Sequence, residues 1–249
     1  MKKGTLEVCV DSFTSAQQAI NAGATRLELC SSLIIGGISP SPIVYRQIRK
    51  ITSIPIHVMV RPRHGDFLYT EDEMDRMIKE TAFWEKEGAC GIVTGMLLAN
   101  GELDVERMKR IIEQAGKMKV ILHRAFDVSK DPFSTLEAGK KIGITGILTS
   151  GQATEAMKGL QVIKELQLAS EGIQIIAGSG VTAENMNAIR EKTGVTAFHM
   201  SGKVRRESEM IFQRKDLSMG ETRIEEYGLW ECSYEKIAQA RKVLEESME

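Results

Sequence analysis

Two short segments of the chain carry a glutamate and a cysteine with the same spacing. Glu7 and Cys9 lie in the first segment, and Glu28 and Cys30 lie in the second. Side chains alternate between the two faces of a strand, so each glutamate shares a face with the cysteine two residues later. The intervening leucines and valines suit the face that packs against helices. We therefore expect both pairs to point into the interior of a closed sheet, with Cys9 and Cys30 close together.

Two neighbouring thiols are suited to binding a soft monovalent cation. Cu(I) prefers cysteine and methionine sulfur, and Met59 on a neighbouring predicted strand could supply a third ligand. A structural zinc site is less favoured, since it would need four well-spaced Cys or His ligands. The alternative is that both cysteines are small apolar core residues.

Charged side chains also occur on strands that should be apolar on both faces. Glu7, Glu28 and Arg61 are examples, and such groups are almost never buried alone. We expect them to face one another across the interior or to bind a ligand. His123, followed by Asp127, stands where a strand passes into a loop and could take part in acid–base chemistry. The alternative is an ion-pair network that fills the interior without a ligand.

Glycine-containing turns follow the last two predicted strands. Gly178-Ser179-Gly180 comes after the seventh strand, and Ser201-Gly202-Lys203 comes after the eighth. Backbone N–H groups in such turns, together with a helix N-terminus, can bind a phosphate or another anion. Two ordinary tight turns are the alternative.

The elements that would position these residues alternate along the whole chain. Short β-rich runs predict strands at 6–10, 26–30, 56–60, 91–94, 120–123, 146–149, 174–177 and 196–200. Segments with a 3.6-residue period predict helices at 15–22, 71–87, 105–115, 154–168, 183–192 and 234–245. About eight such units favour a single (β/α)8 TIM-type barrel, an α/β fold, over residues 1–249. Residues 201–231, charged and without a clear period, should form an irregular segment after the last strand.

The composition excludes several classes of partner. The 249 residues include 33 Lys+Arg and 34 Asp+Glu, which leaves no basic excess for binding nucleic acid or a membrane surface. Glu7 interrupts the position where the apolar region of a signal peptide would lie. Four cysteines in a chain this long do not make a disulfide framework. We therefore expect a cytoplasmic protein without an evident organic cofactor, and homo-oligomerisation stays open.

Several motifs spread over most of the chain point to a known family. They are Leu6-Glu7-Val8-Cys9-Val10-Asp11-Ser12, Leu27-Glu28-Leu29-Cys30-Ser31, Arg61-Pro62-Arg63 with Gly65-Asp66-Phe67, His123-Arg124-Ala125-Phe126-Asp127, Leu148-Thr149-Ser150-Gly151, Ala177-Gly178-Ser179-Gly180-Val181 and Met219-Gly220. Together they resemble the CutC family. The resemblance implies a TIM-type barrel, a cytoplasmic location, a role in copper homeostasis and Cu(I) binding by Cys9 and Cys30. His64 departs from the pattern, because family members usually have glycine there.

Two functions follow as hypotheses. In the first, the protein binds Cu(I) through Cys9 and Cys30 and takes part in copper handling. In the second, it is an enzyme acting on a small anionic or phosphorylated metabolite, with Glu28, His123 and Asp127 as acid–base residues at the C-terminal mouth of the barrel. The ligand-binding residues would then be Glu7, Arg61, Arg63, Asp66, Ser150, Gly178, Ser179, Gly180 and Ser201.

Overall fold

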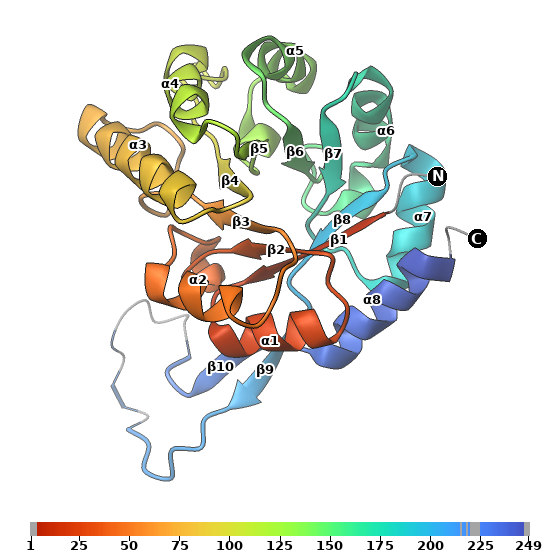
Figure 1. The fold of residues 1–249 in the computed structure, drawn as a ribbon. Coiled ribbons are helices and arrows are strands. Elements are labelled where there is room, and N and C mark those ends of the chain that lie inside the picture. The colour runs from red at the N-terminus through yellow and green to blue at the C-terminus, as the bar shows by residue number, and fades with distance from the viewer. Residues whose placement is uncertain (1–3, 215, 218, 220–224, 247–249) are drawn as a thin grey trace.

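Eight parallel strands close into a barrel, and helices surround it on the outside (Figure 1). This architecture is that of a computed structural model, which describes residues 4–214, 216–217, 219 and 225–246. Gly220 of the Met219-Gly220 motif lies outside the described residues. The closed parallel barrel confirms the (β/α)8 TIM-type fold predicted from the alternation of strands and helices.

The barrel strands follow one another around the ring in sequence order. They are β1 (Thr5–Val10), β2 (Arg26–Leu29), β3 (Ile56–Met59), β4 (Gly91–Thr94), β5 (Lys119–Leu122), β6 (Gly146–Thr149), β7 (Gln174–Ala177) and β8 (Ala197–Met200). Because β8 pairs with β1, residues far apart in the chain become neighbours, and Glu7 stands opposite His199. On the other edge of β1, Cys9 stands opposite Glu28 of β2. Closure of the barrel therefore gathers polar residues from three strands.

Several of the helices that cover the barrel begin where the sequence supplies a capping residue. They are α1 (Phe13–Asn21), α2 (Pro42–Arg49), α3 (Glu71–Lys86), α4 (Val105–Ala115), α5 (Pro132–Ile142), α6 (Leu160–Ala169), α7 (Ala183–Thr193) and α8 (Tyr234–Glu246). Ser12, Thr70 and Asp131 each accept a hydrogen bond from a backbone N–H in the first turn of the following helix. Within the described part of the chain, none of the helices combines the length and apolar character needed to cross a bilayer.

One predicted helix, at 154–168, is divided in the structure. A short 3-10 helix occupies Ala156–Lys158, and α6 begins only at Leu160. The break falls at Gly159, where the backbone lies so close to Ser150 that a Cβ would be 1.9 Å from its carbonyl oxygen. Close backbone packing therefore decides where the helix begins.

Apolar side chains fill two main regions, apart from a small cluster of Cys9, Cys30 and Met59. The larger region lies between the barrel and the helices and includes the outward-facing Leu6 and Val8 of β1. The smaller one occupies one side of the barrel interior and is formed by Val93, Ile121, Leu148, Ile176 and Ala197. Alternation of side chains along each strand separates the two.

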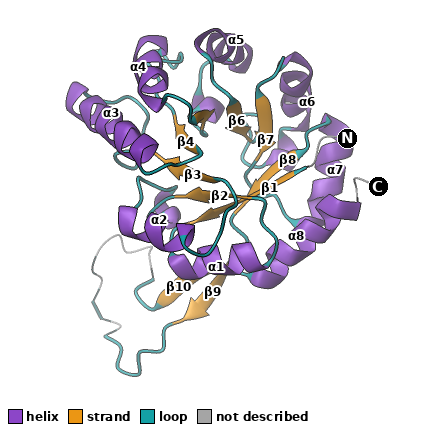
Figure 2. Ribbon diagram, in the orientation of Figure 1, coloured by secondary structure: helices purple, strands orange, loops and turns teal. Residues whose placement is uncertain are grey.

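The segment 201–231 contains regular structure that the sequence did not predict. β9 (Lys203–Glu207) and β10 (Gly228–Cys232) form an antiparallel pair beside α1 (Figure 2). The backbone N–H of Cys232 donates to Ser15 Oγ of α1 at 3.2 Å. Most side chains of β9 are exposed, and pairs such as Arg206–Glu231 join the two strands. The sequence of this segment shows no hydrophobic period because the β9–β10 pair buries little apolar surface.

Candidate functional site

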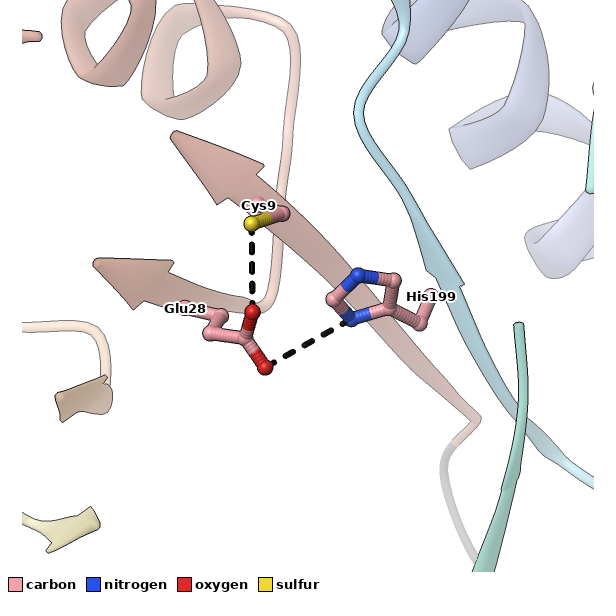
Figure 3. A group of neighbouring side chains, drawn as sticks. All are labelled: Cys9, Glu28 and His199. Atoms are coloured by element: carbon pink, nitrogen blue, oxygen red, sulfur yellow. Dashed lines mark hydrogen bonds and ion pairs between the residues drawn. The ribbon is translucent and has the colours of Figure 1, made fainter. Parts of the chain in front are cut away.

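Three ionisable side chains from adjacent strands meet near the C-terminal ends of β1, β2 and β8. They are Cys9, Glu28 and His199, and Figure 3 shows them pointing toward one another. Cys9 Sγ lies 3.1 Å from Glu28 Oε1, and Glu28 Oε2 lies 4.0 Å from His199 Nδ1. Cys9 and Glu28 are buried, and His199 is nearly so. Burial raises the pKa of Glu28.

The two cysteines are close neighbours, as strand pairing led us to expect. Cys9 Sγ and Cys30 Sγ are 3.7 Å apart, and both thiols share a buried cluster with Met59. The adjacent Cys30 thiol and burial raise the pKa of Cys9 well above its usual value. Gly37 closes over this cluster with a φ of +80°, and a Cβ there would approach both Cys30 Sγ and Met59 Sδ within 3.2 Å. Cys9 is therefore a neutral thiol near pH 7.

Glu7 is the centre of a buried network below these residues. Its carboxylate accepts hydrogen bonds from Arg26 Nε and, at 2.8 Å, from His199 Nδ1, while His57 Nδ1 lies 3.5 Å away. Burial alone would raise the pKa of Glu7, but Arg26 and the two histidines hold it well below the usual value. Burial also opposes charge on His199, yet Glu28 and Glu7 raise its pKa. Glu7 is therefore ionised and fixes the orientation of the His199 ring.

The partner of Glu7 differs from the one that the sequence suggested. We expected Glu7, Glu28 and Arg61 to face one another or to bind a ligand, but the arginine paired with Glu7 is Arg26. Arg26 precedes Glu28 by two residues and so shares its inward face. Arg61 follows the end of β3, nearer the mouth of the barrel, and donates instead to the backbone carbonyls of loop residues. Position along the strand, rather than charge, decides which arginine meets Glu7.

A cavity of about 500 Å³ opens at the C-terminal mouth of the barrel. Cys9, Glu28 and His199 line it, together with Arg61 and His123. The Arg61 guanidinium is held by the carbonyls of the loops and lies over the Phe67 ring at 5.0 Å. In the described structure, its Nε has no hydrogen-bond partner. The cavity therefore contains a buried cation without a carboxylate partner among the residues described.

His123 is a neutral hydrogen-bond donor in the same cavity. Its Nδ1 accepts a hydrogen bond from the backbone N–H of Ala125 at 3.1 Å, so the ring proton resides on Nε2. Burial and the nearby Arg61 lower the pKa of His123 to about 3. Nε2 is buried and has no hydrogen-bond partner within the described ranges. Both His123 and Arg61 thus present unused N–H groups.

Asp127, expected to act with His123, makes other contacts. Its carboxylate accepts hydrogen bonds from Thr149 Oγ1, from the backbone and side chain of Ser150, and from Arg124. These bonds tie the β5 and β6 loops together. Neither Asp127 nor Ser150 belongs to the lining of the cavity found in the described structure. Their proposed catalytic and ligand-binding roles stay predictions, and the contacts observed are structural.

The other predicted ligand-binding residues divide into two groups. Ser179, Gly180 and Ser201 line the cavity beside the N-terminal end of α7. Arg63 instead pairs with Asp66 and with Glu73 of α3 on the protein surface, and it is outside the described cavity lining. Gly178 lies against Leu148, whose Cδ1 would be 2.5 Å from an added Cβ. These positions leave the ligand-binding roles as predictions.

Sequence reasoning missed two members of this site, Arg26 and His199. A signal for each was present, because Arg26 alternates with Glu28 and His199 interrupts an apolar strand. The residues that Arg26 and His199 contact, however, could not be predicted from the sequence. Arg26 bonds to Gln174 of β7 at 2.9 Å as well as to Glu7, and His199 reaches Glu7 from the opposite end of the chain. These contacts depend on closure of the barrel.

Comparison with known proteins agrees with the motifs and the fold. The CutC family model matches residues 4–204. A family protein CutC of Pasteurella multocida is 37% identical over 241 residues, covering 96% of this chain and 98% of that protein. One from Vibrio cholerae is 41% identical over 221 residues, covering 88% of this chain and 87% of that protein.

A solved structure adds a likeness in three dimensions. The crystal structure of the putative copper homeostasis protein CutC from Streptococcus agalactiae matches with a TM-score of 0.76 and 29% sequence identity. The match covers 80% of this chain and 98% of that chain. With the family match over most of its length, the protein described here belongs to the CutC family.

Proposed function

We propose that this protein binds Cu(I) through Cys9 and Cys30 and takes part in copper homeostasis. The observation that carries the proposal is the 3.7 Å separation of the two Sγ atoms, with Met59 in the same buried cluster. Two sulfur ligands about 2.3 Å from a shared ion can be up to about 4.6 Å apart, so the observed pair can hold one cation. The description of the Streptococcus agalactiae protein as a putative copper homeostasis protein supports the same function.

The chemistry of the pair suits tight binding of a soft ion. Cys9 is a neutral thiol in the metal-free protein, so a cation must displace its proton. Cu(I) binds thiolates strongly enough for this exchange, whereas hard cations do not. All four cysteines are free, and the reducing cytoplasm that we propose as the location would keep them so. Binding and buffering of the ion require no turnover.

The test is an anaerobic titration with Cu(I) in the presence of a competing chelator. The wild type should bind one Cu(I) tightly, and the Cys9→Ser/Cys30→Ser double variant should lose that binding. Cys90→Ser is the matched control because Cys90 is an exposed thiol outside the cluster. Equal copper uptake by the double variant and the wild type would refute the proposal.

A second candidate function is catalysis on a small anionic metabolite. It is favoured by Arg61 Nε and His123 Nε2, which are buried in the cavity and have no hydrogen-bond partners in the described structure. A carboxylate or phosphate group could accept hydrogen bonds from both. Glu28 lines the same cavity, and its raised pKa suits a group that takes up and releases protons. Ser179 and Gly180 at the α7 end could bind the anion as well.

This second function is tested by thermal shift with inorganic phosphate, small carboxylates and sugar phosphates. At least one of these anions should stabilise the wild type, and Arg61→Ala should remove the stabilisation. Arg63→Ala is the control, since Arg63 pairs with surface carboxylates outside the cavity. An anion that stabilises Arg61→Ala as strongly as the wild type would count against the site.

A further inference from the structure

We propose that Cys9, Glu28 and His199 form a second metal site, which binds a divalent cation of the Zn²⁺ type and leaves a coordination position open to the cavity. The ligand atoms of the three residues all lie within 4.8 Å of one another. They come from β1, β2 and β8, which are neighbours in the barrel wall (Figure 3). Sulfur, carboxylate oxygen and imidazole nitrogen together are a ligand set that Zn²⁺ accepts.

Glu7 supplies the outer support that such a site requires. A histidine that binds a metal usually donates its other ring N–H to a carboxylate or carbonyl, which fixes its orientation. Here His199 Nδ1 is bound to Glu7 Oε1 at 2.8 Å, and Arg26 holds the other oxygen of the same carboxylate. Nε2 of His199 is then the nitrogen left to bind a cation. The contacts of Glu7 with His199 and Arg26 do not involve the Cys9–Cys30 pair.

Glu28 supplies an independent indication of a cation site. Its side chain is 2% exposed, and Oε2 has no hydrogen-bond partner in the described part of the protein. The nearest basic nitrogen is His199 Nδ1 at 4.0 Å, which already donates to Glu7. A buried carboxylate oxygen without a hydrogen bond is costly, and a cation between the three side chains would supply its partner.

The charge of the ligand set favours a divalent ion. Binding releases to solvent the thiol proton of Cys9 and, from a protonated His199, the proton on Nε2. One thiolate and one carboxylate then offset two positive charges while His199 coordinates as neutral imidazole. The Cys9–Cys30 pair instead offers soft ligands only, which suit a monovalent ion. Because both sites use Cys9, one bound ion excludes the other.

The surroundings indicate what the open position would face. All three ligands line the 500 Å³ cavity, which also contains Arg61 and His123. Sites with three protein ligands leave a fourth position for water or a ligand atom. An anion bound to the cation could therefore extend toward these two donors.

The proposal is tested with Co²⁺ as a spectroscopic probe and Zn²⁺ as its competitor. The wild type should show a thiolate-to-cobalt charge-transfer band that Zn²⁺ abolishes. His199→Gln should lose the band and still bind Cu(I), whereas Cys30→Ser should keep the band and lose tight Cu(I) binding. Glu7→Gln, which removes none of the proposed ligands but replaces the carboxylate that accepts from His199, should weaken Co²⁺ binding by about 10- to 100-fold in the folded variant.

Circular dichroism and thermal unfolding establish that each variant is folded, and Glu28→Gln replaces His199→Gln if the latter fails to fold. A wild type without the charge-transfer band would overturn the proposal. So would a band that survives in folded His199→Gln and Glu28→Gln, or one that disappears in Cys30→Ser, since the cysteine pair would then hold the cobalt. Failure of the Cu(I) proposal is a separate result, namely unchanged copper binding by the Cys9→Ser/Cys30→Ser variant.

Discussion

The two sides of the barrel interior are stabilised in opposite ways. On one side, Val93, Ile121, Leu148, Ile176 and Ala197 form an apolar cluster drawn from β4 to β8. On the other side, strands β1, β2 and β3 contribute buried charged and ionisable groups, namely Glu7, Arg26, Glu28 and His57, and β8 contributes the nearly buried His199. The apolar side needs close packing alone, whereas the polar side is stable only if its groups pair with one another.

This contrast separates structural polar groups from those available to a ligand. Glu7 is fully engaged by Arg26 and His199, so it stabilises the interior. Nearer the mouth, Glu28 Oε2 and His123 Nε2 are buried without hydrogen-bond partners among the described residues. An ion-pair network therefore surrounds Glu7, although Arg26 Nη2 and His57 Nδ1 also lack hydrogen-bond partners among the described residues. What distinguishes Glu28 and His123 is that they line the cavity.

Removal of the Glu7 carboxylate, which is the centre of the polar side, should have the largest effect on stability. Glu7→Ala leaves the buried Arg26 guanidinium without its counter-charge, and we expect the free energy of unfolding to fall by about 3–5 kcal/mol. Glu7→Gln should cost less because the amide oxygen can still accept a hydrogen bond. Urea denaturation measures both variants. A loss below about 1 kcal/mol for Glu7→Ala would show that the network contributes little.

Acidification should reveal the cost of burying His123. The folded protein keeps this ring neutral down to about pH 3, whereas the unfolded chain takes up a proton below about pH 6.5. The unfolded state therefore binds more protons in this interval, and stability falls as the pH decreases. Between pH 7 and pH 5 the contribution is about 2 kcal/mol.

The matched variant is His123→Asn, whose amide oxygen can still accept the Ala125 N–H. Its stability, measured by denaturation at both pH values, should decrease about 2 kcal/mol less than that of the wild type. If the variant and the wild type lose the same stability between pH 7 and pH 5, the His123 ring is not held neutral in the folded protein.

A change on the apolar side should have the smallest effect and should leave the site intact. Ile121→Val removes one buried methylene, and we expect a loss of about 0.5–1.5 kcal/mol in the free energy of unfolding. Cu(I) and Co²⁺ binding should equal those of the wild type, because the polar side does not depend on this cluster for its pairing. Weakened metal binding in this variant would show that the two sides are coupled.

Sequence reasoning predicted some elements better than others for identifiable reasons. The barrel strands were found because their apolar runs are buried on both faces. The proximity of Cys9 and Cys30 was predicted correctly because Cys9 lies on β1 and Cys30 directly follows the neighbouring strand β2. β9 and β10 were missed, since an exposed ladder joined by ion pairs leaves no hydrophobic period. The sequence did not predict the partners of His123 and Asp127, which are the Ala125 N–H and Thr149 Oγ1, because spacing along a loop does not determine which groups a side chain meets.

The sequence by itself determined the alternation of strands and helices, the inward face of each strand and the proximity of the two cysteines. Those features follow from the local periodicity of side chains and from the pairing of strands that are consecutive in the sequence. The tertiary structure decided that His199 joins Cys9 and Glu28, and that Arg26 rather than Arg61 neutralises Glu7. The reason is that β8 meets β1 only when the barrel closes, and the register then sets which side chains share a level.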